Sequence, residues 1–230
     1  MTAPAIRGLC SMATRGLLEE LAAAHSQRSG VPVSFLAMGG VEAARRVSAG
    51  EPFDMVVLAS DAIDKLIAQG RLDAAGKIDL VRSGVAVAVP AGAVRPDIST
   101  EDALRSAVRA APGIAYSTGP SGVALMALFE RWGMAGEIRD RLVQAPPGVP
   151  VGSLLARGDA ALGFQQLSEL IGIEGIDLVG PLPPEVQIAT VFSAAPVVGC
   201  AQPSAVRALL ESMRSADSAK AKRRHGMAPA

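Results

Sequence analysis

The sequence is poor in aromatic side chains, which make up 3% of its 230 residues: one Trp, one Tyr and five Phe. Nucleic-acid and carbohydrate sites stack their ligands on aromatic rings, so the small number of aromatic residues argues against both kinds of ligand. The 22 basic and 22 acidic residues leave no net charge to attract a polyanion. The basic run at residues 220–225 is interpreted as the solvated face of a last helical turn. We therefore expect a small ligand and no nucleic acid.

Cysteine and histidine are also scarce, with two of each. Cys10 and Cys200 lie in apolar segments without a disulfide or metal-ligand spacing, so we expect two buried free thiols. His25 falls at the edge of an apolar helix face and is expected to be structural, and His225 lies in the tail. A G-x-S-x-G elbow, a P-loop and a paired metal-ligand motif are all missing. We expect neither a metal nor a cofactor.

Long apolar runs are missing as well. A membrane-spanning helix needs about 18–20 apolar residues, and the best run, residues 84–94, is broken by Pro90. The first residues, from Met1 to Arg7, lack the charged segment, apolar core and cleavage site of a secretory signal. We therefore expect a cytoplasmic protein without a membrane span. A chain from which a signal had been removed would read much the same and would be periplasmic.

The first third of the chain alternates short apolar strands with amphipathic helices. Strands are expected at 6–10, 31–36 and 54–59, each followed by a helix, and Ser60 or Asp61 is expected to cap the third helix. The continuous apolar run before Ser60 is typical of a parallel strand covered on both faces. The order predicts a parallel, doubly wound lobe.

A second lobe is expected to begin after a polar connection that precedes the apolar strand at 85–89. Its expected elements are a helix at 100–110, a strand at 113–116, a small-residue loop at 117–122, a helix with the apolar stripe Leu125, Met126, Phe129 and Trp132, a helix at 148–156, a strand at 161–164, a helix at 165–171 and a strand at 176–179. Residues 188–201 return the chain to the first lobe, where a helix at 203–213 closes it. We therefore predict an α/β protein with lobe 1 at 1–82 and 193–230 and lobe 2 at 83–192.

Three loops at the carboxyl ends of predicted strands share one composition: residues 10–12, 37–40 and 118–122. Each contains small hydroxyl-bearing or glycine residues and leads into a helix, whose free N–H groups and dipole favour an anion. In parallel α/β sheets, ligands bind at this edge. The alternative is that Ser11 and Ser121 are plain N-caps. Three such turns on one edge favour an anion site.

Four acidic or phenolic side chains are candidates for proton transfer: Tyr116, Glu169, Asp61 and Asp64. Asp61 is more simply a residue of a helix N-terminus. Tyr116 ends a strand beside the 117–122 loop and is the best single candidate for a specific contact. Arg15, in the first turn after Ser11, carries a planar guanidinium whose parallel N–H donors suit a carboxylate.

With these segments in order, the chain resembles the molybdate-binding periplasmic proteins of the type II solute-binding class. The resemblance rests on "LLEELAAAHSQRSGVPVSF", "MGG", "GEPFDMVVLASDAIDKLIAQGRL", "GVAVAVPAGA", "STGPSGVALMALFERWGM", "LLARGDAALGFQQLSEL" and "ADSAKAKRRHGMAPA". It implies two lobes, each a mostly parallel sheet flanked by helices, and an oxyanion held by serine hydroxyls and backbone N–H groups in the cleft between them. For an exported member it implies an ABC permease as partner.

By matching motif, the resemblance places the pocket at Ser11, Gly39 or Gly40, Ser121 or Gly122, Val151, and the Gln165/Gln166 pair. With the neighbours considered above, the candidate ligand-binding residues are Ser11, Met12, Arg15, Gly39, Gly40, Ser60, Tyr116, Thr118, Ser121, Gly122, Val151, Gln165 and Gln166. We expect Ser11 and Ser121 to face each other across the cleft.

The chain departs from the molybdate binders at three of these places. It reads Leu9-Cys10-Ser11-Met12 where they usually have Ala-Ala-Ala-Ser, its second loop lacks the expected serine, and the glutamine pair replaces a common tyrosine. Fewer hydroxyls, more amides and a nearby Arg15 favour an organic carboxylate over molybdate.

Four functions remain open. The first is a binding protein for a small anion. The second is an isomerase of an unsaturated polycarboxylate, similar to the aconitate isomerase-like proteins, with Tyr116, Glu169 or a water as proton carrier and Arg15 with backbone N–H groups stabilising an enolate. The third is the molybdate-binding component of an ABC transporter, and the fourth is a regulatory or structural module.

Overall fold

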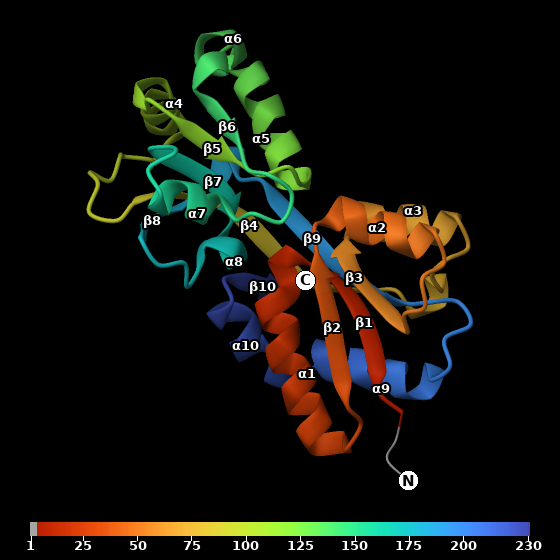
Figure 1. The fold of residues 1–230 in the computed structure, drawn as a ribbon. Helices are drawn as coiled ribbons and strands as arrows, with labels where there is room; N and C mark the ends of the chain where they lie inside the picture. Colours follow the sequence, from red (N-terminus) through yellow and green to blue (C-terminus); the bar gives the residue numbers. More distant parts are fainter. Residues whose placement is uncertain (1–3) are drawn as a thin grey trace. The chain divides into compact units, whose positions relative to one another are not determined.

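The computed structural model describes residues 4–230 and divides the chain into two compact units. Unit 1 joins the segment that ends at Arg82 to Val191–Ala230, and unit 2 is Ser83–Thr190. The chain passes between the units within strands β4 (Ile78–Pro90) and β9 (Ala189–Pro196). Residues 1–3, which the predicted first lobe includes, lie outside the described residues. The mixed α/β content confirms the predicted class (Figure 1).

Unit 1 contains a sheet in the order β2-β1-β3-β9. Strand β1 pairs in parallel with β2 and β3, and β9 runs antiparallel to β3. The bounds are β1 (Ile6–Ser11), β2 (Val33–Met38), β3 (Met55–Ala59), α1 (Arg15–Ser29), α2 (Gly40–Ser48), α3 (Ser60–Ala68), α9 (Pro203–Arg214), α10 (Ala219–Arg224) and β10 (Met227–Pro229), with 3-10 turns η1 (Met12–Thr14), η2 (Ala74–Gly76) and η5 (Ala216–Ser218). Figure 1 shows β1, β2 and β3 running side by side as the alternating pattern predicts.

Helices cover both faces of this sheet, which explains the continuous apolar run of β3. Met55 and Val57 pack in one core with residues of α1 and α9, whereas Val56 and Leu58 pack in another with residues of α2 and α3. Alternate side chains of a strand point to opposite faces, so a strand covered on both must be apolar throughout. All five residues of β3 are buried.

In unit 2 the strands assemble around β4. Strand β4 pairs antiparallel with β7 and β8, and β5 pairs in parallel with both β7 and β6. The bounds are β5 (Ile114–Tyr116), β6 (Leu142–Gln144), β7 (Leu162–Gln166), β8 (Ile176–Pro181), α4 (Glu101–Ala110), α5 (Pro120–Arg131), α6 (Ala135–Ile138), α7 (Val151–Ala156) and α8 (Leu167–Leu170), with 3-10 turns η3 (Arg139–Arg141) and η4 (Pro184–Val186). Val85, Val87 and Val89 of β4 join a core with α4 and α5, and Ala86 and Ala88 join one with α7. The predicted stripe on α5 is confirmed as core, with Met126 only partly buried.

Two predicted elements are wrong in extent. The expected helix at 165–171 is reduced to Leu167–Leu170, because Gln165 and Gln166 continue the β7 ladder opposite Ala86 and Val85. The expected polar connection before Val85 is part of β4, which already begins at Ile78. Its polar side chains are satisfied there: Asp79 Oδ1 accepts a hydrogen bond of 2.6 Å from Ser193 Oγ. Strand pairing outweighs composition at both places.

Three smaller expectations also need correction. Neither Ser60 nor Asp61 caps α3, whose N-cap is Ala59. The basic tail is not wholly solvated, since Lys222 is 3% exposed and burial lowers the pKa of its ammonium. Cys10 is a buried free thiol with a pKa raised by burial to about 12, but Cys200 is only half-buried. No helix within residues 4–230 combines the length and apolar character that a membrane span requires.

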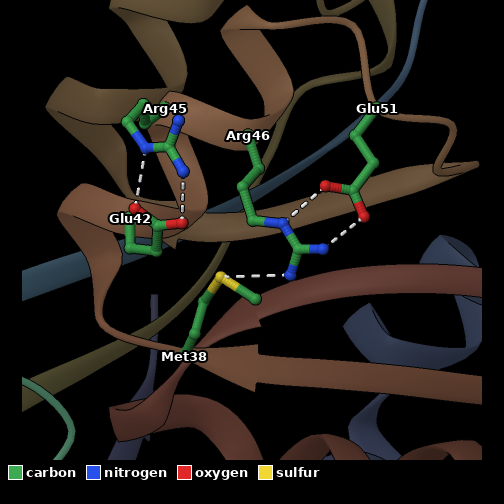
Figure 2. Close-up of polar contacts among 5 residues, drawn as sticks. All are labelled: Met38, Glu42, Arg45, Arg46 and Glu51. Carbon is green, nitrogen blue, oxygen red and sulfur yellow. Dashed lines mark hydrogen bonds and ion pairs between the residues drawn. The ribbon is translucent and has the colours of Figure 1, made fainter.

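Helix α2 is tied to its surroundings by Arg46. Figure 2 shows its guanidinium between Glu51 and Met38. It donates to both carboxylate oxygens of Glu51, at 2.5 and 2.6 Å, and Nη1 lies 3.8 Å from Met38 Sδ. The neighbouring Arg45–Glu42 pair on the same helix is also bidentate, but its side chains are 69% and 49% exposed against 30% and 29% for Arg46–Glu51.

These two pairs give a matched test of stability. Arg46→Ala should lower the free energy of unfolding by about 1 kcal/mol, because it removes a half-buried bidentate ion pair and the packing of the aliphatic part of the Arg46 side chain. Arg45→Ala should cost at most about 0.5 kcal/mol, since water screens its pair. Urea unfolding of both variants measures the difference. Equal losses would show that the Arg46 pair adds nothing beyond a surface ion pair.

Candidate functional site

Unit 1 gathers five of the predicted ligand residues at one edge of its sheet. Strands β1, β2 and β3 are parallel, so their carboxyl ends share that edge, and Ser11 is the register partner of Met38. A helical segment starts directly after each strand. We call this set the unit 1 edge; its members are Ser11, Met12, Gly39, Gly40 and Ser60. Free N–H groups at three helical starts make the edge suited to an anion.

Ser11 is not a plain N-cap. It is 7% exposed, and its side chain makes no capping hydrogen bond to the turn that follows. Its Oγ lies 3.3 Å from Thr14 Oγ1, and the Thr14 hydroxyl in turn donates to the Ser11 carbonyl oxygen at 3.1 Å. The pair therefore presents a buried hydroxyl at the carboxyl end of β1 and leaves the backbone N–H groups of the turn for other partners.

The charged candidates of unit 1 are already paired. The Arg15 guanidinium pairs with Glu19 at 2.9 Å and its side chain is 57% exposed. Asp64 pairs with Lys77 at 2.6 Å, and Asp61 lies 3.7 Å from Lys65. Asp61 and Asp64 are therefore structural ion-pair partners in this unit.

Lys77 is a cation of the unit 1 edge that sequence reasoning missed. Its ammonium donates to Ser60 Oγ at 2.9 Å, and its side chain is 23% exposed. The residue lies just before β4, 17 positions after Ser60, and no motif links the two. The sheet brings them together, so the signal exists only in three dimensions.

Unit 2 forms a second edge of the same kind from β6, β5 and β7. The parallel register pairs Tyr116 with Gln144 on one side and with Phe164 on the other, so the carboxyl ends of the three strands lie together. We call this set the unit 2 edge; its members are Tyr116, Thr118, Ser121, Gly122, Val151, Gln165 and Gln166. Tyr116 packs partly against the core shared with α5, whereas Thr118 is exposed.

The 117–122 segment folds tightly onto the start of α5. The Ser117 and Ser121 hydroxyls lie 3.2 Å apart, and the Gly122 N–H donates to the Gly119 carbonyl at 3.0 Å. Ser121 is 6% exposed and lies inside the first turn, so it is not the N-cap, which is Gly119. The turn holds two hydroxyls and several backbone N–H groups at a helix start.

Gln166 carries an unused polar atom. The side chain is 3% exposed, its Nε2 donates to Thr190 Oγ1 at 2.8 Å, and its Oε1 has no partner among the described residues. A threonine hydroxyl both donates and accepts, so the amide can turn over and leave its N–H group free instead. An unpaired buried polar group is costly and is usually satisfied by a ligand or water. Gln166 therefore offers a hydrogen bond to a bound molecule.

Gln165 and Glu169 form the other polar group of this edge. The Val151 N–H, predicted to bind the ligand, donates instead to Gln165 Oε1 at 2.8 Å. Burial raises the pKa of Glu169, in α8, to about 7, and the amide of Gln165 offsets part of that rise. A carboxyl group with such a pKa exchanges a proton readily at neutral pH.

Among the described residues, no metal-ligand cluster lies at either edge, and the surface hollows of unit 1 lie apart from its edge. In the part of the chain from residue 4 onward, no three His, Cys, Asp or Glu side chains come close enough together to hold a metal ion. Unit 1 has two surface hollows, of about 630 and 590 Å³, whose linings include Arg7, Asp54 and Arg207. Arg7 lies near the start of β1, away from the carboxyl ends, and neither hollow includes a predicted ligand residue.

Comparisons with known proteins agree with this arrangement. A family model described as "bacterial extracellular solute-binding protein" matches residues 6–228. A protein named aconitate isomerase, from Pseudomonas sp, is 39% identical over 227 residues, which cover 96% of this chain and 86% of that one. The periplasmic molybdate-binding protein of Azotobacter vinelandii superposes with a TM-score of 0.82 at 19% identity over 98% of this chain and 99% of its own. The sulfate-binding protein of Mycobacterium tuberculosis gives 0.80 at 17% identity over 99% and 87%.

Proposed function

Because the chain belongs to the family of bacterial extracellular solute-binding proteins, we propose that its solute is an unsaturated tricarboxylate of the aconitate type, which it isomerises. The observation that carries this proposal is the 39% identity to aconitate isomerase over nearly the whole length of both chains. The molybdate- and sulfate-binding structures, below 20% identity, support the fold alone. Glu169 supplies the acid–base group that the reaction needs.

The reaction is a proton shift between two carbons. In aconitate, a CH2 group and a CH= group flank one central carbon, and each of the three carbons carries a carboxylate. A base removes a proton from the CH2 group, and the electron pair left behind forms a new double bond to the central carbon. The electrons of the old double bond take up a proton at the former CH= carbon. The product has the double bond on the other side, and no oxidant or reductant is consumed.

We assign the proton transfer to Glu169. Its pKa of about 7 lets it accept the proton as a carboxylate and return it as an acid at neutral pH. The intermediate spreads negative charge over carboxylate oxygens, which hydrogen-bond donors stabilise. The unit 2 edge supplies such donors at the start of α5 and, with its amide turned over, at Gln166.

The unit 1 edge, taken by itself, also carries groups that suit a carboxylate. It offers the hydroxyl of Ser11, the backbone N–H groups at the starts of α2 and α3, and the ammonium of Lys77 beside Ser60. Charge-assisted hydrogen bonds of this kind are about twice as strong as neutral ones. Both cations are paired, Lys77 with Asp64 and Arg15 with Glu19. Lys77 replaces Arg15 as the proposed countercharge because its side chain is 23% exposed against 57% for Arg15 and because it also donates to Ser60.

The second candidate is a carrier that binds a carboxylate without changing it. The family description favours it, because solute-binding proteins as a class hold small ligands. For an exported carrier, the partner would be an ABC permease. This candidate shares the binding residues of the first and differs only in the absence of turnover.

One experiment separates the candidates. The purified protein, unfolded and refolded to remove bound ligand, is incubated with cis-aconitate in D2O and followed by proton NMR. Isomerisation should produce trans-aconitate and incorporate deuterium at the exchanging carbons. Calorimetric titration with cis-aconitate, its saturated analogue propane-1,2,3-tricarboxylate, molybdate and sulfate runs in parallel. Aconitate binding without turnover would support the carrier, and micromolar molybdate binding without any response to a tricarboxylate would overturn both candidates.

A further inference from the structure

We propose that Thr190 is a positioning residue that turns the Gln166 amide so that its N–H group faces an ionised carboxylate of the bound ligand. The inference rests on the proposed function, which makes the ligand a carboxylate, and it deepens that function by naming the residue that orients one donor. It applies to the isomerase and to the carrier, because both bind the same ligand. Thr190 is not among the ligand-binding residues that the sequence predicts.

The Gln166 amide differs from its neighbour in the kind of partner that holds it. Gln165 Oε1 accepts the Val151 N–H at 2.8 Å, and a backbone N–H can only donate, so this amide has one orientation. Gln166 Nε2 lies 2.8 Å from Thr190 Oγ1, and a hydroxyl both accepts and donates. Thr190 can therefore hold the Gln166 amide in either of two orientations.

Each orientation leaves one end of the buried amide open. In the structure Nε2 donates to Thr190, and Oε1 has no partner among the described residues, although the side chain is only 3% exposed. With the amide turned over, the Thr190 hydroxyl donates to Oε1 and Nε2 becomes the open end. A buried polar group without a partner is costly, so a ligand atom that supplies the partner is favoured. Thr190 decides whether that atom must donate or accept.

An ionised carboxylate requires the orientation with the N–H group open, because its oxygens only accept. Strand β7 and helix α7 contain no cation, so neutral donors must meet the ligand charge there. Among residues 4–230 the Thr190 hydroxyl has no other hydrogen-bond partner, which leaves its proton available for Oε1. A hydroxyl that donates to Oε1 polarises the amide and makes its N–H a better donor.

The test measures the Kd of propane-1,2,3-tricarboxylate, which cannot isomerise, by calorimetry at about pH 8, where its carboxylates are ionised. Thr190→Val keeps the shape of the side chain and removes the hydroxyl. The amide is then not held before binding, and Oε1 faces a methyl group when the ligand is bound. Kd should rise by about 3- to 10-fold, the equivalent of one neutral hydrogen bond. Thr190→Ser restores the hydroxyl and should bind within about 2-fold of the wild type.

Two Gln166 variants test the direction of the hydrogen bond and the dependence on Thr190. Gln166→Glu keeps the shape but places a like charge against the ligand carboxylate, so Kd should rise by at least about 100-fold. Unchanged or tighter binding would show that the open end accepts from the ligand, and would overturn the inference. In a Gln166→Met background, Thr190→Val should cause no further rise, because Thr190 acts through Gln166. A full additional rise would show that Thr190 acts independently.

The matched control is Thr100→Val, because the Thr100 hydroxyl has a purely local contact in unit 2. Its Oγ1 accepts the Ala103 N–H at 3.1 Å at the start of α4. Its loss should lower the unfolding midpoint without changing Kd. If Thr190→Val fails to fold, Thr190→Ala takes its place. A Kd within about 2-fold of the wild type in a folded Thr190 variant without the hydroxyl would overturn the inference alone. A wild-type protein that binds no tricarboxylate would overturn the proposed function and the inference with it.

Discussion

Replacing Glu169 by Gln is expected to lower kcat for aconitate isomerisation by at least about 100-fold, the lower end of the range for losing a general acid–base group. Glutamine keeps the size and polarity of the side chain but cannot accept and return a proton. Because the carboxylates of the substrate are assigned to other groups, the Kd for aconitate should change by less than about 10-fold. Single-turnover NMR and calorimetry of the same preparation measure the two quantities.

The same substitution should raise stability at alkaline pH. The folded protein holds the Glu169 proton up to about pH 7, whereas the unfolded chain releases it near pH 4.5. The unfolded state therefore binds fewer protons across that window, and wild-type stability falls as pH rises through it. Glu169→Gln should match the wild type near pH 4.5. Above pH 7 it should be more stable by about 1–3 kcal/mol, with allowance for partial exposure of the side chain.

The control for both measurements is Glu174→Gln, which removes an exposed carboxylate five residues further along the chain. It should leave kcat and the pH dependence of unfolding as they are. Full activity in Glu169→Gln would assign the proton transfer elsewhere, with Tyr116 as the next candidate at the same edge. A stability gain without a loss of activity would leave Glu169 as a half-buried carboxyl group with no catalytic part.

Most of the fold follows from the apolar pattern. The continuous apolar run of β3 predicts a strand buried on both faces, and alternate residues of β3 do lie in two separate cores. The pattern fails where a strand carries polar residues. Asp79, Ser83, Gln165 and Gln166 all lie in β4 or β7, whose ladder pairs the backbone. Ser193, Ser168 and the Val151 N–H are partners of the first three side chains, whereas Gln166 keeps its Oε1 unpaired among the described residues.

The candidate site was predictable only in its positions along the chain. The small-residue loops at Ser11, Gly39 and Ser121 do lie at helical starts on the carboxyl edges of parallel strands. Which polar atoms are free depends on contacts between distant residues, and a single sequence carries no signal of these. The Val151 N–H is taken by Gln165, and Ser60 is joined by Lys77. The Arg15–Glu19 pair differs, because it is an i,i+4 contact within α1 whose spacing the sequence does show.

Gly122 has a steric role in the backbone that the sequence alone does not reveal. Its place in a small-residue loop favours an anion contact, but the structure adds a steric requirement. A Cβ at this position would lie 1.8 Å from the Ser117 carbonyl oxygen and 2.8 Å from its carbon. Both neighbours are backbone atoms, so no side-chain rotation can relieve the contact. The close approach is what lets the Ser117 and Ser121 hydroxyls come within 3.2 Å of each other.

Gly122→Ala is therefore expected to push the 117–119 segment away from the start of α5. The cost to the free energy of unfolding should be roughly 1–3 kcal/mol, the usual range for forcing a methyl group into a packed place. Gly119→Ala is the matched control in the same loop: among the described residues, no atom lies within 4 Å of the place that its methyl group would take, and its φ of −79° suits alanine. That variant should be neutral or slightly stabilising, because alanine restricts the unfolded chain.

We expect Gly122→Ala to weaken the binding of aconitate and Gly119→Ala to leave it unchanged. In Gly122→Ala the displaced turn no longer aims its N–H groups and the Ser121 hydroxyl together, so Kd should rise by about 10-fold or more, the equivalent of one or two lost hydrogen bonds. Gly119→Ala should bind as the wild type does. Calorimetric titration beside urea unfolding measures both properties on each variant. Unaltered stability and affinity in Gly122→Ala would mean that the loop relaxes freely, and that the tight turn is not needed to hold the ligand.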